Sequence, residues 1–278
     1  MGLLDIQTAL GRLVRAPDGR DPFRSLHLDA SERAALGALT RSPGFQFTVG
    51  VQRSWCVART MNGGSLTLSI LPEDLRRTLL DEWTNAGGGT SSFFAAEADR
   101  LLDFIARRLP YPSHELTACR LEQATLRAND AAALFTPPGS ARLNAARCVL
   151  RRGRHAGIVF FHGEPEQILD ALLEHNPLPP VSPHATPILF GPGLDRLCRP
   201  AELSEVELWE ELTAPVAFVE LLTNHFRRDA VEAMLRAGAI EYVEPSSKEL
   251  AQHGMRRDQF VVQPEGACRT FYASEENS

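Results

Sequence analysis

Residues 136–161, TPPGSARLNAARCVLRRGRHAGIVFF, divide the 278-residue sequence into two halves of different character. They open on TPPGS, a run of residues that is typical of loops. Residues 147–152 (RCVLRR) and 156–161 (AGIVFF) follow, and they predict two strands joined by a turn at Gly153. The sequence therefore predicts a domain boundary at the start of this stretch.

The sequence before the boundary predicts helices. Asp29 and Glu32 have the spacing of a capping box. Pro72 followed by two acidic residues is a typical helix start, because the first turn needs no amide donor and favours negative charge. Residues 116–134 are rich in Ala and Leu and predict another helix. Residues 45–60 combine β-branched residues with a helical face, so their secondary structure stays open.

Short helices and strands alternate after the boundary. Residues 165–174 predict a helix, and Gly238 has the position of a C-terminal helix cap. Further helices are predicted at 215–223 and 227–237, and further strands at 187–190, 239–243, 260–262 and 270–272. The expected fold class is α+β: a helical domain at residues 1–139, then a domain at residues 140–278 with a small antiparallel sheet and a winged-helix-like helix pair.

The composition is that of an ordinary globular protein. Hydrophobic residues make up 44% and charged residues 23% of the chain, and the net charge of −6 argues against nucleic-acid binding by overall charge. The five cysteines show no CxxC spacing. The N-terminus lacks the apolar core of a signal peptide, and no apolar run reaches the roughly 20 residues that cross a membrane. We therefore expect a cytoplasmic protein that binds neither nucleic acid nor membrane.

Motifs of self-sufficient catalysis are missing from the sequence. It contains no GxSxG nucleophile elbow, no GxxxxGK[ST] phosphate loop and no HExxH zinc motif, and its eight histidines are scattered. Residues 87–89, GGG, are interpreted as a flexible connector. Two alternatives stay open: a stand-alone metalloenzyme, and a winged-helix DNA-binding regulator. The regulator would use Arg227, Arg228 and Arg236, but Asp229 and Glu232 interrupt the positive charge of that helix.

An arginine-rich stretch is the one positive signal for binding. No acidic residue occurs from residue 131 to residue 163, and the arginines lie on or beside the two predicted strands. An exposed strand edge lined by arginines would bind an extended acidic peptide as an added strand. The alternative is that these charges protect the edge from aggregation. The candidate peptide-binding residues are Arg147, Arg151, Arg152, Arg154, Ile158 and Phe160.

Three segments carry a resemblance to a known family. They are residues 45–83 (FQFTVGVQRSWCVARTMNGGSLTLSILPEDLRRTLLDEW), 91–110 (SSFFAAEADRLLDFIARRLP) and 116–128 (LTACRLEQATLRA). This pattern of aromatic, Arg and Glu positions resembles the TglI- and MbnC-like partner proteins of multinuclear non-haem iron enzymes that oxidatively modify ribosomally made peptides. The likeness covers most of residues 23–135 and is weaker in residues 208–243.

The resemblance implies a non-catalytic subunit. In that family a separate barrel-shaped enzyme holds the iron, so no cofactor is expected in this chain. The partner protein forms a heterodimer with the enzyme and engages the leader of the precursor peptide. In the 3-thiaglutamate pathway, which the nearest members serve, the pair excises the β-carbon of a C-terminal peptide cysteine. Residues matching the most distinctive motifs are expected at the partner interface or as stabilisers of the helical domain: Arg53, Trp55, Cys56, Arg59, Arg120, Glu122 and Arg127.

Overall fold

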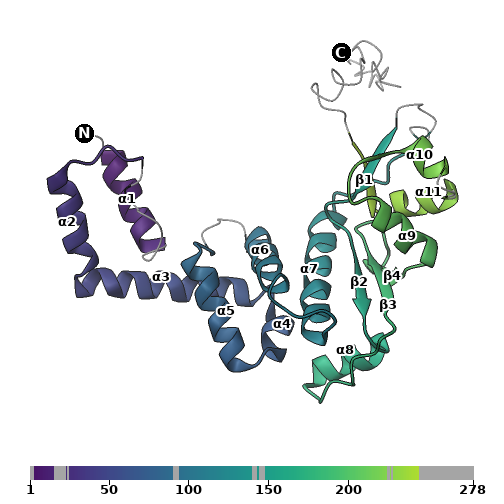
Figure 1. The fold of residues 1–278 in the computed structure, drawn as a ribbon, viewed down its shortest axis with the longest axis horizontal. Coiled ribbons are helices and arrows are strands. Elements are labelled where there is room, and N and C mark those ends of the chain that lie inside the picture. The colour runs from purple at the N-terminus through teal and green to yellow at the C-terminus, as the bar shows by residue number, and fades with distance from the viewer. Residues whose placement is uncertain are drawn as a thin grey trace, which may run out of the picture.

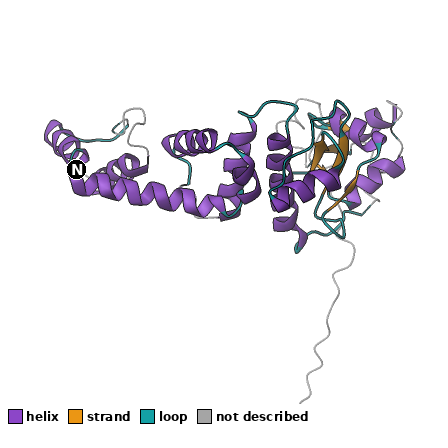
Figure 2. Cartoon of the chain, turned by 90° about the horizontal axis from the view of Figure 1, so that it is seen from below, coloured by secondary structure: helices purple, strands orange, loops and turns teal. Residues whose placement is uncertain are grey.

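The chain is an α+β protein in which helices come first and small sheets follow (Figure 1). The computed structural model describes residues 3–15, 23, 25–89, 94–139, 143, 148–223, 226 and 228–243. Three N-terminal helices extend away from the rest as an arm, and the strands gather at the opposite end of the molecule (Figure 2). The predicted fold class is confirmed. Within the described ranges, no helix is long and apolar enough to span a bilayer.

The arm consists of α1 (Leu3–Arg15), α2 (Ala30–Thr40) and the first half of α3 (Pro43–Met61). Its core joins Ala9 and Leu13 of α1 to Phe45 and Val49 of α3, among other buried residues. The predicted capping box is confirmed, because the α2 cap residue and the glutamate three positions later bond each other's backbone amides. The segment left open by the sequence, residues 45–60, lies in one continuous helix.

The central helices pack around a second core. They are α4 (Ser65–Ile70), α5 (Glu73–Asn85), α6 (Phe94–Ala106) and α7 (His114–Ala132). Leu79, Trp83, Leu101, Ile105 and Cys119 are buried where α5, α6 and α7 meet. The predicted start of α5 at proline is confirmed, since Pro72 is its N-cap.

The glycines at 87–89 form a closely packed turn, so the interpretation as a flexible connector is wrong. A Cβ on Gly88 would lie 2.2 Å from Cε2 of Trp83. Gly89 has a φ of +77°, and a Cβ there would lie 2.3 Å from the Cβ of Cys56. The turn therefore needs glycine at 88 and 89 in order to pack against Trp83 of α5 and Cys56 of α3.

The described strands form two antiparallel sheets. In one, β1 (Val149–Arg152) lies between β5 (Val216–Ala217) and β6 (Ile240–Tyr242); in the other, β3 (Thr186–Phe190) lies between β2 (Gly157–Phe161) and β4 (Cys198–Pro200). The predicted pairing of β1 with β2 through a turn at Gly153 is therefore wrong. Gly153 instead donates its N–H to the carbonyl of Ala239 at 2.7 Å, which continues the pairing of β1 with β6. The chain leaves that sheet and β2 pairs with β3.

Four further helices complete the described second half. They are α8 (Pro165–Glu174), α9 (Leu203–Glu211), α10 (Phe218–Thr223) and α11 (Arg228–Arg236). The helix predicted at 165–174 and the cap at Gly238, whose φ is +71°, are confirmed. The strands predicted at 260–262 and 270–272 lie outside the described residues, and the winged-helix detail stays a prediction.

The helix α7 connects the two halves. Its Ala118 and Ala124 belong to a buried cluster with Val159 and Phe161 of β2, while its Cys119 belongs to the core it shares with α6. The boundary predicted near residue 139 follows α7, so the last helix of the first half contacts the sheets of the second.

Replacing Gly88 by Ala tests the packed turn. The added methyl would overlap the indole of Trp83, so we expect Gly88→Ala to lower the free energy of unfolding by about 1–3 kcal/mol. Gly37→Ala is the matched control, since Gly37 lies inside α2 and a Cβ there meets nothing within 4 Å. The control should stabilise the protein by about 0.5–1 kcal/mol. Urea denaturation measures both, and equal stability of the two variants would contradict the packed turn.

Candidate peptide-binding groove

The strand β2 has a free edge within the described part of the chain. It pairs with β3 on one side, and its Phe160 lies opposite Pro187, which has no N–H to donate. The carbonyl of Phe160 instead accepts a hydrogen bond from Oγ1 of Thr117 on α7, at 3.0 Å. Since backbone direction alternates along an antiparallel strand, the N–H and C=O of Ile158 also point away from β3. The backbone N–H and C=O groups of two predicted binding residues, Ile158 and Phe160, therefore point away from β3.

A cavity of about 190 Å³, here called the β2 cavity, lies between this edge and α7. Its walls are mostly apolar, with Arg120 as the charged member. They are formed by Tyr111, Ser113, Leu116, Thr117, Arg120, Ile158, Val159, Phe160 and His162. Ser113 sets the start of α7, because its side chain accepts the N–H of Leu116 at 3.1 Å. The helix thus presents one side to the strand edge.

One end of the β2 cavity is closed by His162 and Tyr111. Nδ1 of His162 lies 3.2 Å from the carbonyl of Ser182, so this nitrogen carries the proton and donates it. Nε2 of His162 is buried and has no hydrogen-bond partner among the described residues. The ring of Tyr111 packs edge-on against it, with the centroids 5.2 Å apart, and Tyr111 is 70% exposed. The sequence did not single out Tyr111 or Thr117, because their partners lie far away along the chain.

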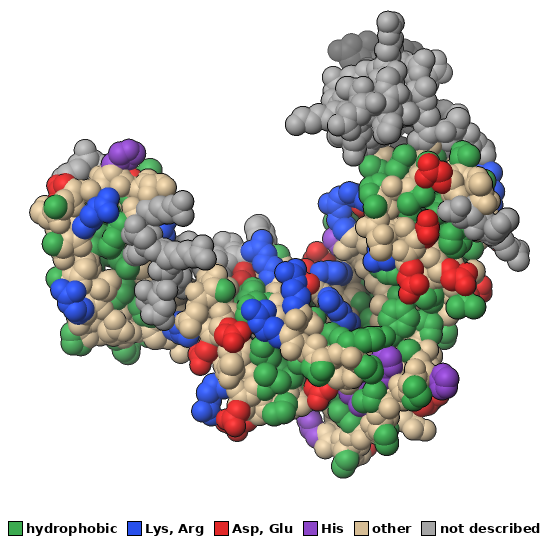
Figure 3. All heavy atoms as spheres, in the orientation of Figure 1, with side chains coloured by type: hydrophobic (Ala, Val, Ile, Leu, Met, Phe, Trp, Pro, Cys, Tyr) green, Lys and Arg blue, Asp and Glu red, His purple; other side chains and the backbone are tan. Residues whose placement is uncertain are grey.

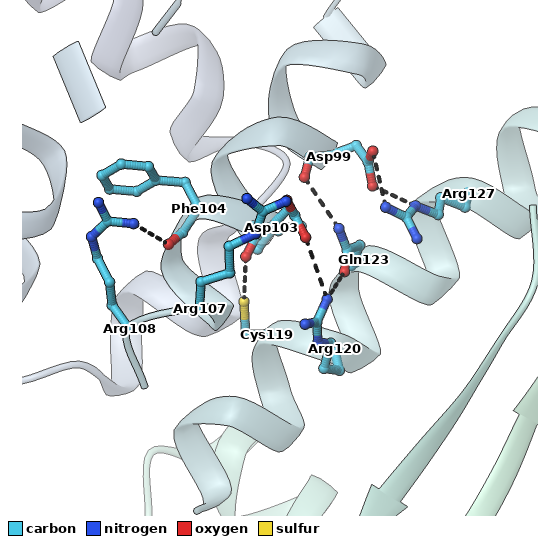
Figure 4. A network of polar contacts seen from close by, with 10 residues as sticks. Asp99, Asp103, Phe104, Arg107, Arg108, Cys119, Arg120, Gln123 and Arg127 are labelled. Carbon is cyan, nitrogen blue, oxygen red and sulfur yellow. Dashed lines mark hydrogen bonds and ion pairs between the residues drawn. The ribbon is translucent and has the colours of Figure 1, made fainter. Parts of the chain in front are cut away.

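Arg120 and Arg127 lie on α7 beside the cavity and pair with α6 (Figure 4). Nε of Arg127 donates to Asp99 at 2.5 Å, and its NH2 group reaches the other oxygen at 3.2 Å. Arg120 donates to Gln123 at 2.7 Å and lies 3.7 Å from Asp103, which also pairs with Arg107. Three guanidinium groups share two carboxylates, so this network carries a net positive charge. Figure 3 shows Lys and Arg side chains gathered over the middle of the concave side of the molecule.

Glu122 does not pair with these arginines, although it lies between them in sequence. Its two oxygens accept the N–H groups of Leu66 and Thr67, each at 2.7 Å, and the hydroxyl of Thr67 at 2.5 Å. It therefore caps the first turn of α4 from α7, which is a stabilising role in the helical half.

The expected arginine-lined edge at residues 147–152 is wrong, because β1 is paired on both sides. Arg151 donates to Glu241 of β6 at 2.7 Å, and Nε of Arg154 lies 3.7 Å from the same oxygen. Arg152 donates to the carbonyl of Trp209 at 2.7 Å and lies over that indole ring. Arg151 and Arg154 therefore pair with the neighbouring strand β6, Arg152 connects the sheet to α9, and Arg147 lies outside the described residues.

The remaining predicted residues lie in the second half of α3, away from the groove. Arg53 bonds Asp81 at 3.2 Å and Asn85, both on α5. Cys56 is buried, and its thiol donates to the carbonyl of Gly89 at 3.1 Å. Trp55, the preceding residue of the helix, is 64% exposed. Arg59 is half-buried on the same helix. The structure thus separates this set from Arg120, which it brings together with Ile158 and Phe160.

Metal ligation and thiol reactivity depend on how side chains cluster and how deeply they are buried. The described ranges contain no group of three or more His, Cys, Asp or Glu side chains that could hold a metal ion. Burial raises the pKa of the Cys119 thiol to about 12 and that of Cys148 to about 11, so both stay protonated at neutral pH.

The β2 cavity and the strand edge beside it combine outward backbone groups, apolar walls and positive charge. These features suit binding of an extended peptide. Searches against protein-family models and against curated proteins find no match for the chain.

Replacing Glu122 by Gln tests its capping role. The amide nitrogen cannot accept a hydrogen bond and the negative charge at the start of α4 is lost, so we expect the free energy of unfolding to fall by about 1–2 kcal/mol. Asp130→Asn is the control, since Asp130 is an exposed carboxylate near the other end of α7. Its substitution should change stability by less than about 0.5 kcal/mol. Thermal and urea unfolding measure both, and an unchanged Glu122→Gln protein would rule out the cap.

Proposed function

We propose that this chain is a non-catalytic subunit that binds a precursor peptide and positions it for a separate, barrel-shaped non-haem iron enzyme. The observation that carries the proposal is the free edge of β2, where the N–H and C=O of Ile158 open onto the β2 cavity next to Arg120. An extended peptide gains affinity from backbone bonds to such an edge, and selectivity from the side chains around it.

The groove offers the peptide a short length of edge. The Thr117 hydroxyl already donates a hydrogen bond to the carbonyl of Phe160. The groups that remain for a bound chain are the N–H and C=O of Ile158 and the N–H of Phe160. Apolar side chains of the peptide would enter the β2 cavity, and its acidic side chains would meet Arg120. Recognition of this kind holds a peptide without performing chemistry on it.

The chemistry belongs to the partner in this proposal. The resemblance of residues 45–83, 91–110 and 116–128 supports a heterodimer in which the iron stays in the barrel-shaped enzyme and this chain carries no cofactor. The reaction would be an oxidative excision at a peptide cysteine, of the 3-thiaglutamate type. The subunit would contribute by raising the effective concentration of the peptide at the iron enzyme, in the cytoplasm.

Selection from a phage-displayed library of 12-residue peptides on the immobilised full chain tests the binding site. Enriched peptides should bind the wild-type protein and lose at least about tenfold in affinity for Ile158→Pro, which removes the outward N–H. Proline is tolerated on an edge strand where the N–H faces away from the ladder, so the variant should fold. Fluorescence anisotropy with labelled peptides measures the affinities.

Ile158→Val is the matched control, because it keeps the N–H and most of the side chain. It should bind within about threefold of wild type, the effect of one buried methylene. Circular dichroism establishes that both variants are folded. Absence of any enriched peptide, or equal binding by Ile158→Pro and Ile158→Val, would exclude the free edge of β2 as the peptide site.

A further inference from the structure

A second and larger cavity lies at the other end of α7. It has a volume of about 510 Å³ and is here called the β6 cavity. Its walls combine the end of α7 and the segment after it with β6, and are formed by Asp130, Ala131, Leu134, Phe135, Thr136, Pro138, His155, Pro192, Gly238, Ile240, Glu241 and Tyr242. Leu134 lines this cavity and is 88% exposed, so its side chain offers an accessible apolar surface there.

The β6 cavity also lies beside the outer strand of a sheet, since β6 pairs with β1 alone among the described strands. Val243 donates its N–H to Val149 at 2.9 Å, and Ala239 accepts the N–H of Gly153 at 2.7 Å, so these residues of the β6 segment face β1. By the antiparallel alternation, the N–H and C=O groups of Ile240 point away from β1. Each cavity therefore combines one side of α7 with outward backbone groups of an edge strand.

The two cavities lie along the same side of α7. Arg120 of the β2 cavity and Arg127 are seven residues apart, close to two helical turns, so their side chains lie in one row, and Leu134 of the β6 cavity follows the last residue of α7 by two positions. The rise from Arg120 to Ala132, the last residue of α7, is about 18 Å at 1.5 Å per residue, and Leu134 lies just beyond it. An extended chain covers that length in about six residues.

The middle of the row is positively charged. Arg120 and Arg127 share Asp99 and Asp103 with Arg107, and three guanidinium groups against two carboxylates leave an excess of positive charge between the cavities. The walls of the two cavities are mainly apolar. Those of the β2 cavity include Leu116, Ile158 and Phe160. Those of the β6 cavity include Leu134, Phe135 and Pro192. The β6 cavity also has two carboxylates in its walls: Glu241, which is engaged by Arg151 and Arg154, and Asp130, which is exposed at the end of α7.

We infer that the two cavities bind one extended peptide segment, with two apolar side chains about six residues apart and an acidic residue between them facing Arg120 and Arg127. This inference rests on the proposed peptide-binding function and defines the chemistry of the ligand. The apolar side chains supply buried area at the ends, and the acidic residue fixes the register at the centre.

The peptides selected on the full chain test the inference. Their consensus should show one acidic residue flanked by two apolar residues about six positions apart. Replacing the acidic residue by its amide should weaken binding to wild type about tenfold, the loss expected for a hydrogen bond to a charged group. The same loss should follow Arg120→Gln, which should then no longer distinguish the acid from the amide. Inserting one residue between the two apolar positions should also weaken binding, because it turns one side chain to the other face.

Arg41→Gln is the matched control on the protein, since it removes the same charge from an exposed residue at the end of α2 in the arm. It should leave affinity within about twofold. Two outcomes would overturn the inference and leave the proposed function standing. In the first, the enriched peptides lack the acidic residue or the spacing. In the second, they bind Arg120→Gln as well as wild type but still require the Ile158 N–H. Should Arg120→Gln fail to fold, the acid-to-amide and insertion peptides on wild type decide the matter alone.

Discussion

The structure depends on the burial of α7 between the central helices and the second sheet. Small residues make this position accessible to a helix: Ala118 and Ala124 contact Val159 and Phe161 of β2, and a Cβ on Gly157 would lie only 3.7 Å from that of Ala124. On its other sides α7 buries Cys119 against α6 and uses the carboxylate of Glu122 to cap α4. One helix thereby organises both halves of the chain and provides one wall of both cavities.

The groove follows from how α7 meets β2. The backbone of a helix bonds itself, so a helix satisfies the outward groups of a strand edge only through side chains, and α7 does so here through the bond from Thr117 to the carbonyl of Phe160. Ile158 keeps its edge groups beside a cavity, and the arginines on the neighbouring side of α7 are held in place by Asp99 and Asp103. A rigid helix with fixed charges next to an open strand edge needs little rearrangement to receive an extended chain, which lowers the entropic cost of binding.

Local signals in the sequence predicted local structure well, and the long-range pairing was not predictable from them. The capping box at Asp29, the proline before α5 and the glycine after α11 each act within a few residues, so their patterns predicted helix ends that the structure confirms. The pairing of β1 depends on Ala217 and Glu241, far along the chain, and adjacency in sequence gave the wrong partner. Of the predicted site residues, Ile158, Phe160 and Arg120 come together, yet only the fold reveals that Arg151 and Arg152 are engaged within it.

A subunit of this kind would act by holding a peptide along α7 while another protein carries the iron. The most direct measurement is the mass of the precursor peptide after co-expression with its cognate non-haem iron enzyme, with and without this chain. The account predicts an oxidative mass change that requires the chain and that Ile158→Pro diminishes. A peptide left unmodified in the presence of the chain and a folded, iron-loaded enzyme, or modified equally well without the chain, would contradict it.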